Sequence, residues 1–202
     1  NDAARALRAT EDALMACVVR PEGVMSATRA SMTLGALYEA TDGGSLYSRA
    51  NELLDAATTS KSTAFAKASA FKALMRLGEK FGDKLCGNAS AYARAACASL
   101  RPNDDARCRR AALRFLAATC EQSAGGLDGK AIAAVYKALV RSENDRSSGV
   151  RAAFVDAIGA LALAWAASRE KGVVSASDLD ITGVVERILH ALKDDSARVR
   201  DA

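Results

Sequence analysis

The stretch Val150-Arg151-Ala152-Ala153-Phe154-Val155-Asp156-Ala157-Ile158 decides the fold, because related stretches recur along the chain. In each copy a basic residue begins a run of alanines and larger apolar residues, and these basic residues are Arg29, Lys67, Arg109, Arg151 and Arg200. They are 38, 42, 42 and 49 positions apart. A fixed period of about 20–50 residues indicates an array in which each unit buries its apolar face against its neighbours. We therefore expect a repeat protein.

The repeating units are predicted to be helical. Alanine accounts for 46 of the 202 residues, and alanine has the highest helix propensity. Val, Ile and Thr are too scattered to form strands, and the period-two alternation of a half-buried strand is absent. Both prolines, Pro21 and Pro102, fall where helices are expected to end. Composition and periodicity together predict an all-α fold.

Apolar periodicity and helix-stop residues predict nine complete helices and the start of a tenth. The eighth shows the pattern, because Val150, Phe154, Ile158, Leu161 and Trp165 recur at spacings of three and four and form one apolar face. The expected helices cover residues 3–19, 25–40, 46–57, 61–80, 89–100, 106–122, 128–142, 147–168 and 179–192, and the tenth follows residue 196. Trp165 and the four methionines are expected in the core, at Met15, Met25, Met32 and Met75.

A short polar turn precedes the basic residue in three units. These turns are Asn103-Asp104-Asp105, Asn144-Asp145 and Asp194-Asp195, and each lies four to six residues before its arginine. A carboxylate at the start of a helix accepts free backbone N–H groups and complements the helix dipole. An aspartate turn followed by Val-Arg, small residues and a Leu or Ile position resembles the second helix of a HEAT repeat.

The resemblance implies a right-handed α-solenoid of about four and a half HEAT-like antiparallel helix pairs, as in HEAT and armadillo proteins. The units would cover residues 1–43, 44–82, 83–124, 125–170 and, incompletely, 171–202. In the family, the aspartate and the arginine form a ladder between neighbouring repeats. The resemblance thus implies structural roles for Asp104, Arg109, Asp145, Arg151, Asp195 and Arg200. Because no polar cap closes the last unit, we expect the chain to be part of a longer array.

Charge, hydropathy and cysteine content indicate which partners and which cellular compartment to expect. The net charge of +4, from 28 basic and 24 acidic residues, is mild for a nucleic-acid-binding domain. The longest apolar stretch, residues 155–167, is shorter than the roughly 20 residues that cross a membrane, so no membrane span is expected. The five cysteines form no C-x-x-C pair and indicate reduced thiols of an intracellular protein, which we expect in the cytoplasm rather than the nucleus.

Catalytic and cofactor chemistry finds little support. The segment Ala124-Gly125-Gly126-Leu127-Asp128-Gly129-Lys130-Ala131 lacks both the first glycine and the final Ser/Thr of a phosphate-binding loop. His190 is the only histidine, and no carboxylates of metal-ligand spacing surround it. The same shortage of histidine disfavours Ser-His and Cys-His catalysis. We therefore expect neither an enzyme nor a bound cofactor or metal.

One cluster of arginines is a candidate binding site. Arg107, Arg110 and Arg114 are spaced i, i+3, i+7 and share one helix face. Arg101 and Arg146 lie in neighbouring turns and could extend the patch. Such a patch suits an acidic partner, which could be a protein tail, tubulin or nucleic-acid phosphate. The absence of interleaved aromatic residues disfavours single-stranded nucleic acid, and the alternative to a binding site is a solvated helix face.

The sequence predicts a non-enzymatic scaffold that binds other proteins. One alternative is an array that resembles TOG domains and binds tubulin through the loops inside each pair, here 20–23, 58–61, 101–105, 141–147 and 193–196. The first loop of that family usually presents a tryptophan, which is absent from residues 20–23. Another alternative is a chromosome-associated HEAT subunit that contacts nucleic acid through a basic groove.

Overall fold

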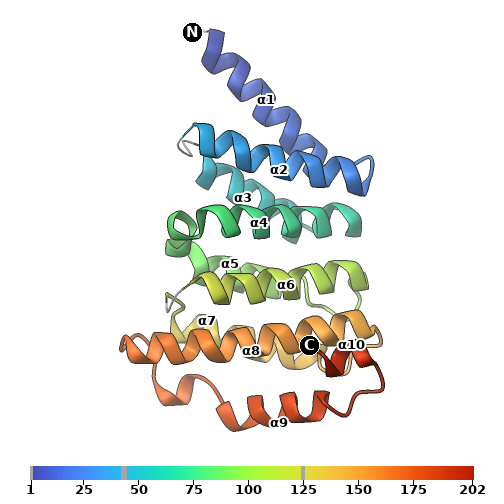
Figure 1. The fold of residues 1–202 in the computed structure, drawn as a ribbon, viewed down its shortest axis with the longest axis vertical. Coiled ribbons are helices and arrows are strands. Elements are labelled where there is room, and N and C mark those ends of the chain that lie inside the picture. The colour runs from blue at the N-terminus through green and yellow to red at the C-terminus, as the bar shows by residue number, and fades with distance from the viewer. Residues whose placement is uncertain (1, 42–44, 124–125) are drawn as a thin grey trace.

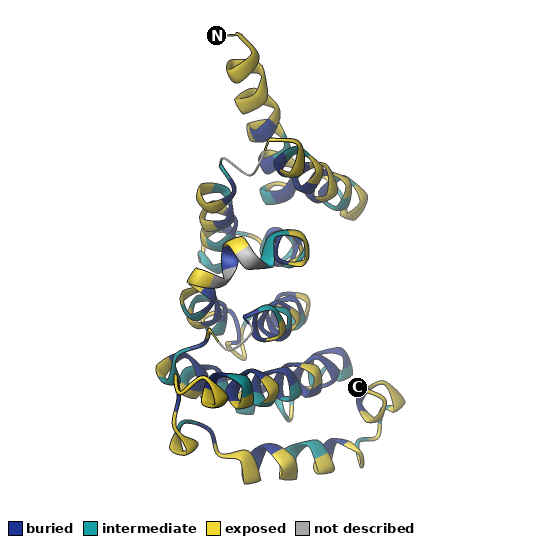
Figure 2. Cartoon of the chain, turned by 60° about the vertical axis from the view of Figure 1, so that its left-hand side comes forward, coloured by how far each residue is buried: buried dark blue, intermediate teal, exposed yellow. Residues whose placement is uncertain are grey.

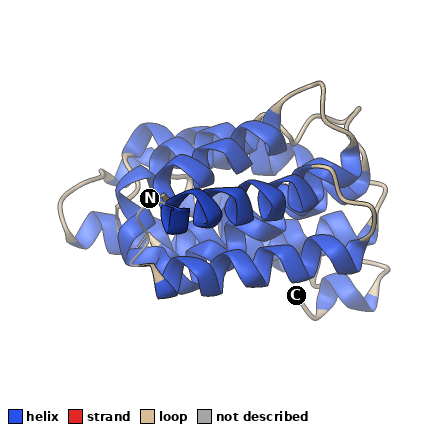
Figure 3. Ribbon diagram, turned by 90° about the horizontal axis from the view of Figure 1, so that it is seen from above, coloured by secondary structure: helices blue, strands red, loops and turns tan. Residues whose placement is uncertain are grey.

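The computed structural model describes residues 2–41, 45–123 and 126–202, and every regular element in these ranges is a helix (Figure 3). The prediction of an all-α fold is confirmed. The α-helices are α1 (Asp2–Val19), α2 (Val24–Ala40), α3 (Leu46–Thr58), α4 (Ala64–Leu85), α5 (Ala89–Cys97), α6 (Ala106–Gln122), α7 (Gly129–Leu139), α8 (Ser148–Glu170), α9 (Ile181–Ala191) and α10 (Ala197–Arg200). The expected unit boundaries at 43/44 and 124/125 lie outside the described residues.

Consecutive helices form pairs, and the pairs lie side by side along the long axis of the molecule (Figure 1). Within pairs, α1 packs on α2, α3 on α4, α5 on α6 and α7 on α8. Between pairs, α2 contacts α4, α4 contacts α6, and α6 contacts α8. The helices α2, α4, α6 and α8 therefore make one layer, at the front of Figure 1, and α3, α5 and α7 make a second layer behind it.

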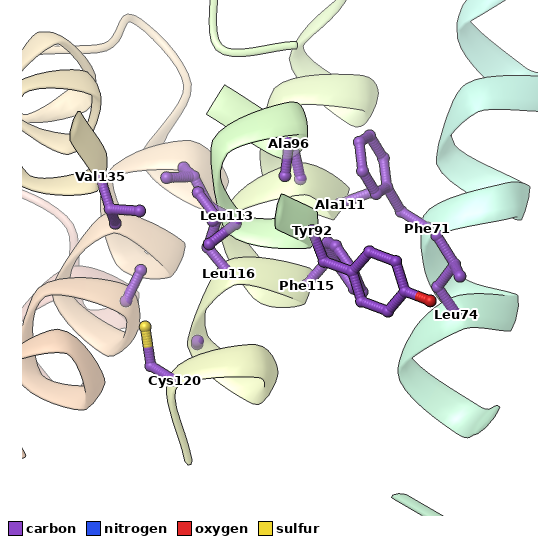
Figure 4. Packing of buried hydrophobic residues seen from close by; sticks show 14 of the residues in the cluster. Phe71, Leu74, Tyr92, Ala96, Ala111, Leu113, Phe115, Leu116, Cys120 and Val135 are labelled. Atoms are coloured by element: carbon purple, nitrogen blue, oxygen red, sulfur yellow. The ribbon is translucent and has the colours of Figure 1, made fainter. Parts of the chain in front are cut away.

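The core lies between the two layers and between successive pairs (Figure 2). Alanines such as Ala112 and Ala157 are fully buried and let neighbouring helices approach closely. Larger side chains fill the remaining space, and the rings of Phe71 on α4 and Phe115 on α6 are 5.5 Å apart (Figure 4). Phe154 on α8 is 1% exposed, as its position in the apolar face predicts.

The longest helix, α8, runs through the middle of this core. It ends in a Schellman motif, in which the N–H of Gly172 donates to Arg169 and the N–H of Val173 donates to Ser168. Gly172 has φ +70°, a conformation that glycine adopts without strain. By length and composition alone, α8 is the one helix among the described residues that could cross a membrane. It packs against α6, α7 and α9 and is mostly buried, as a core helix is.

Several element ends and core positions differ from the sequence expectation. The fourth helix begins at Ala64 rather than at residue 61 and is kinked at Phe81, where φ is −128°. The seventh ends at Leu139, and the following turn, Val140–Ser142, tightens into a 3-10 helix. Met25 and Met32 on α2 are 63% and 61% exposed, so their placement in the core was wrong.

Candidate binding face

The best-defined polar contacts lie at the edge where the second helix of each pair begins. The guanidinium of Arg109 on α6 donates two hydrogen bonds to the carboxylate of Asp145, of 2.8 and 3.0 Å. The same guanidinium donates to the backbone carbonyls of Pro102 and Asp104 in its own turn. Asp145 also accepts from the backbone N–H of Ser147 at the start of α8. One arginine thus joins the turn before α6 to the turn before α8.

The same contact recurs in the neighbouring units. Arg151 on α8 donates to both carboxylate oxygens of Asp194, at 2.7 and 2.8 Å, and to the backbone carbonyl of Asp145. Lys67 on α4 lies 3.6 Å from the carboxylate of Asp104. We call these three contacts the ladder. In each of them a basic residue reaches the aspartate turn of the following unit.

The ladder differs from the sequence expectation in two respects. Each arginine bonds the carboxylate of the following unit, whereas the side chain of its own aspartate faces the preceding one. Arg151 makes its bidentate contact with Asp194 and a single contact of 2.8 Å with the predicted Asp195, whose side chain is 90% exposed. Arg200 is exposed and donates to the backbone carbonyl of Asp194.

Hydrogen bonding favours the ionised form of two ladder carboxylates, Asp145 and Asp194. Burial of Asp145 opposes ionisation, but the hydrogen bonds from Arg109 and from the N–H of Ser147 outweigh it and lower its pKa. Arg151 holds the pKa of Asp194 well below its usual range. The charged groups of the ladder are thus paired with one another.

A second cluster of cations is free of such contacts and lines a groove between α4 and α6. Arg107, Arg110 and Arg114 lie on its α6 side, as the i, i+3, i+7 spacing predicts, and Lys72 lies on its α4 side. Phe65 and Met75, two apolar residues of α4, also line this space, whose volume is about 1100 Å³. We call these six residues the basic groove.

The basic groove gathers positive charge from α4 and α6. None of its four cations forms an ion pair with a described residue. Arg198 of α10 adds another positive charge, because its side chain and that of Arg110 both approach Gly149 of α8. Burial, and then the like charges of Arg114 and Arg198, lower the pKa of Arg110. An anionic group in the groove would relieve this repulsion.

The groove continues into a region of opposite charge. Met75 and Arg114 also line a second space of about 970 Å³, which extends over the C-terminal half of α6 towards α8. Its acidic side chains are Glu79, Glu121 and Asp156, which we call the acidic end, and Arg114 borders it on the side of the basic groove. Burial raises the pKa of Asp156, and the nearby charge of Arg114 partly offsets that effect.

Two of the predicted patch residues lie elsewhere. Arg146 lines a separate pocket of about 790 Å³ between the loops 101–105 and 141–147, together with Arg141 and the ladder residues Arg109 and Asp145. Arg101 is exposed in the first of these loops and lines neither space. Arg101 and Arg146 belong to the loops before α6 and α8, so neither is part of the arginine face along α6.

The segment compared with a phosphate-binding loop forms a helix start instead. The carboxylate of Asp128 accepts from the N–H of Ala131 at 2.7 Å and thereby caps α7. Ala124 and Gly125 lie outside the described residues. Among the residues that the structure describes, no cluster of three His, Cys, Asp or Glu side chains could hold a metal ion. His190 is 69% exposed and lies 3.8 Å from Glu143.

No family model, curated protein or solved structure matches this chain. What the face can bind follows from its own shape and charge. The basic groove supplies unpaired cations beside apolar side chains, an arrangement that binds an anionic group and an apolar group together.

Proposed function

We propose that the chain is a right-handed α-solenoid of HEAT-like helix pairs. The side-by-side packing of successive pairs supports this assignment. So does the ladder, in which a basic residue of one unit holds the aspartate turn of the next at three successive places. In such an array each unit contacts only its neighbours, and a long face stays open for partners.

We further propose that this solenoid is a non-enzymatic intracellular scaffold that binds an acidic surface of another protein through the basic groove. The observation that carries this proposal is the set of four unpaired cations around Phe65 and Met75. Clustered like charges disfavour the compact state. Complementary charges on a partner compensate for that repulsion and speed association.

A second candidate is a TOG-like, tubulin-binding array. The observation in its favour is the pocket between the loops 101–105 and 141–147, where Arg141 and Arg146 are exposed at the loop edge. Its wall includes the ladder pair Arg109 and Asp145, so variants there must leave that pair intact. Arg141→Glu with Arg146→Glu should abolish sedimentation with microtubules if this edge is the binding site.

Charge reversal tests the basic groove. The variant Arg107→Glu/Arg110→Glu/Arg114→Glu should lose the acidic partners that wild type captures from cell extract. Arg107 and Arg114 are exposed and Arg110 is half-buried. Exposed positions tolerate substitution within about 0.5 kcal/mol each, so the helical signal should be kept and the melting temperature should change little. Binding of tubulin and duplex DNA is compared at two salt concentrations, because contacts to phosphate weaken steeply with salt.

A matched control carries the same change in net charge outside the groove. Lys61, Lys130 and Lys137 are exposed and line neither the groove nor its acidic end. Their replacement by glutamate should leave every partner bound. Retention of all partners by the groove variant would contradict the proposal and would make the arginine face a solvated surface.

A further inference from the structure

The charges on the exposed face of α6 are segregated along the helix. Arg107 and Arg110 lie at its N-terminal end, Arg114 in the middle, and Glu121 near its C-terminal end. The neighbouring helix α4 has the same order, because it contributes Lys72 to the basic groove and Glu79 to the acidic end, whereas the only charged residue that α8 contributes to these two spaces is Asp156. At a rise of about 1.5 Å per residue, positions 107 and 121 are roughly 21 Å apart.

The two charged regions meet at Arg114, which borders both spaces and whose charge acts on Asp156. None of Glu79, Glu121 and Asp156 forms an ion pair with a described residue. The space between the regions is bordered by Met75, Ala117 and Ala118, whose side chains are apolar or small. A ligand that covers both regions therefore meets positive charge, then apolar surface, then negative charge.

We infer that this face binds a polypeptide segment of matching charge polarity, with acidic residues over Lys72, Arg107 and Arg110 and basic residues over Glu79, Glu121 and Asp156. An apolar residue of the segment lies between them, against Met75. The inference rests on the proposed function and specifies the partner chemistry of the same site.

Nucleic acid fits this face less well than a polypeptide does. A nucleic acid carries a negative charge at every nucleotide, so a strand long enough to span the face would bring phosphates over the carboxylates of the acidic end. A polypeptide can change the sign of its charge within a few residues. About 14 helical residues, or about six extended ones, cover the roughly 21 Å between the two regions.

Synthetic peptides test the inference by fluorescence anisotropy. Two labelled 14-residue peptides carry an acidic block, a central leucine and a basic block, in opposite chain directions. A uniformly acidic peptide of equal length and a duplex DNA are the comparison probes. We expect one of the two charge-polar peptides to bind wild type at least about tenfold more tightly than the uniformly acidic peptide, because like-charge contacts across an interface are unfavourable.

A charge-reversed acidic end should invert this preference. In Glu79→Lys/Glu121→Lys/Asp156→Lys the whole face is basic, so the uniformly acidic peptide and the DNA should bind more tightly than either charge-polar peptide. The control Glu22→Lys/Glu170→Lys/Glu186→Lys changes three exposed carboxylates outside the face and should keep the wild-type preference. Circular dichroism verifies that both variants are folded.

Equal or absent binding of all four probes to wild type would overturn the inference, as would tighter binding of the uniformly acidic peptide or of DNA. An unchanged preference in the acidic-end variant would overturn it too. The proposed function is judged separately, by whether the variant with Arg107, Arg110 and Arg114 reversed loses captured partners. If the variant loses those partners but the peptides do not bind as expected, the proposed function is retained and only the inference about charge polarity is rejected.

Discussion

At the residue scale, the arginine of the ladder explains why the repeated Val-Arg motif is kept together with the aspartate turn. A guanidinium offers five N–H donors in a planar fork. Arg109 and Arg151 each use two of these donors on a carboxylate of the following unit and at least one on a carbonyl of their own turn. Lys67, with a single 3.6 Å contact to Asp104, cannot reproduce this geometry.

The ladder predicts a position-dependent cost of removing arginine. Arg151→Ala should destabilise the protein by about 2–4 kcal/mol, because the partly buried carboxylate of Asp194 loses its partner. Arg29 occupies the same motif position on α2 but is exposed, so Arg29→Ala should cost no more than about 0.5 kcal/mol. Urea unfolding at neutral pH measures the free energy of unfolding of both variants. Equally small losses in the two would mean that the ladder contact of Arg151 does not stabilise the fold.

At acid pH, the difference in the free energy of unfolding between wild type and Arg151→Ala should disappear. Because Arg151 lowers the pKa of Asp194 in the folded state, the stabilisation is complete above the ordinary aspartate pKa of about 3.9. It is lost as the pH falls from there towards the folded-state pKa. The two unfolding curves should therefore converge below about pH 3, and a constant separation would assign the stabilisation to packing of the arginine stem.

At the element scale, α8 and α6 pack against each other and bury much of the apolar face of α8. Phe154 is 1% exposed, whereas Leu163 on the same helix is 72% exposed. Phe154→Ala should destabilise by about 3–5 kcal/mol, because it leaves a cavity between helices that cannot collapse fully. Leu163→Ala is the control and should change stability by about 0.5 kcal/mol or less. Similar costs at the two positions, measured by urea unfolding, would mean that the apolar face of α8 is rotated.

The ends of α6 were predictable, because a polar turn that ends in Asp105 directly precedes its apolar pattern. Asp105 accepts from the N–H of Arg107, and the observed bounds match the expected ones. The start of α4 was not predictable, because residues 58–63 offer five Ser or Thr side chains as caps. Thr63 takes that role and accepts from the N–H of Ala66. Only the packing of α4 against its neighbours selects among these candidates.

At the scale of the whole molecule, the sequence predicted the half of the site that lies on one helix. Spacing along α6 places Arg107, Arg110 and Arg114 together. Lys72 and Asp156 come from other helices, and their positions relative to α6 depend on how the pairs pack. Periodicity within one helix contains no information about that register. For the same reason the sequence grouped Arg146 with the patch, although it lies at the loop edge.

Lysine reactivity tests most directly whether a partner covers this face. Lys72 lines the basic groove, whereas Lys61, Lys130 and Lys137 are exposed outside it. Acetylation of the free protein and of its complex with a captured partner is compared by mass spectrometry. We expect the partner to slow acetylation of Lys72 several-fold and to leave the acetylation rates of the other three lysines unchanged. Unchanged reactivity of Lys72, with protection of Lys61, Lys130 or Lys137 instead, would contradict it.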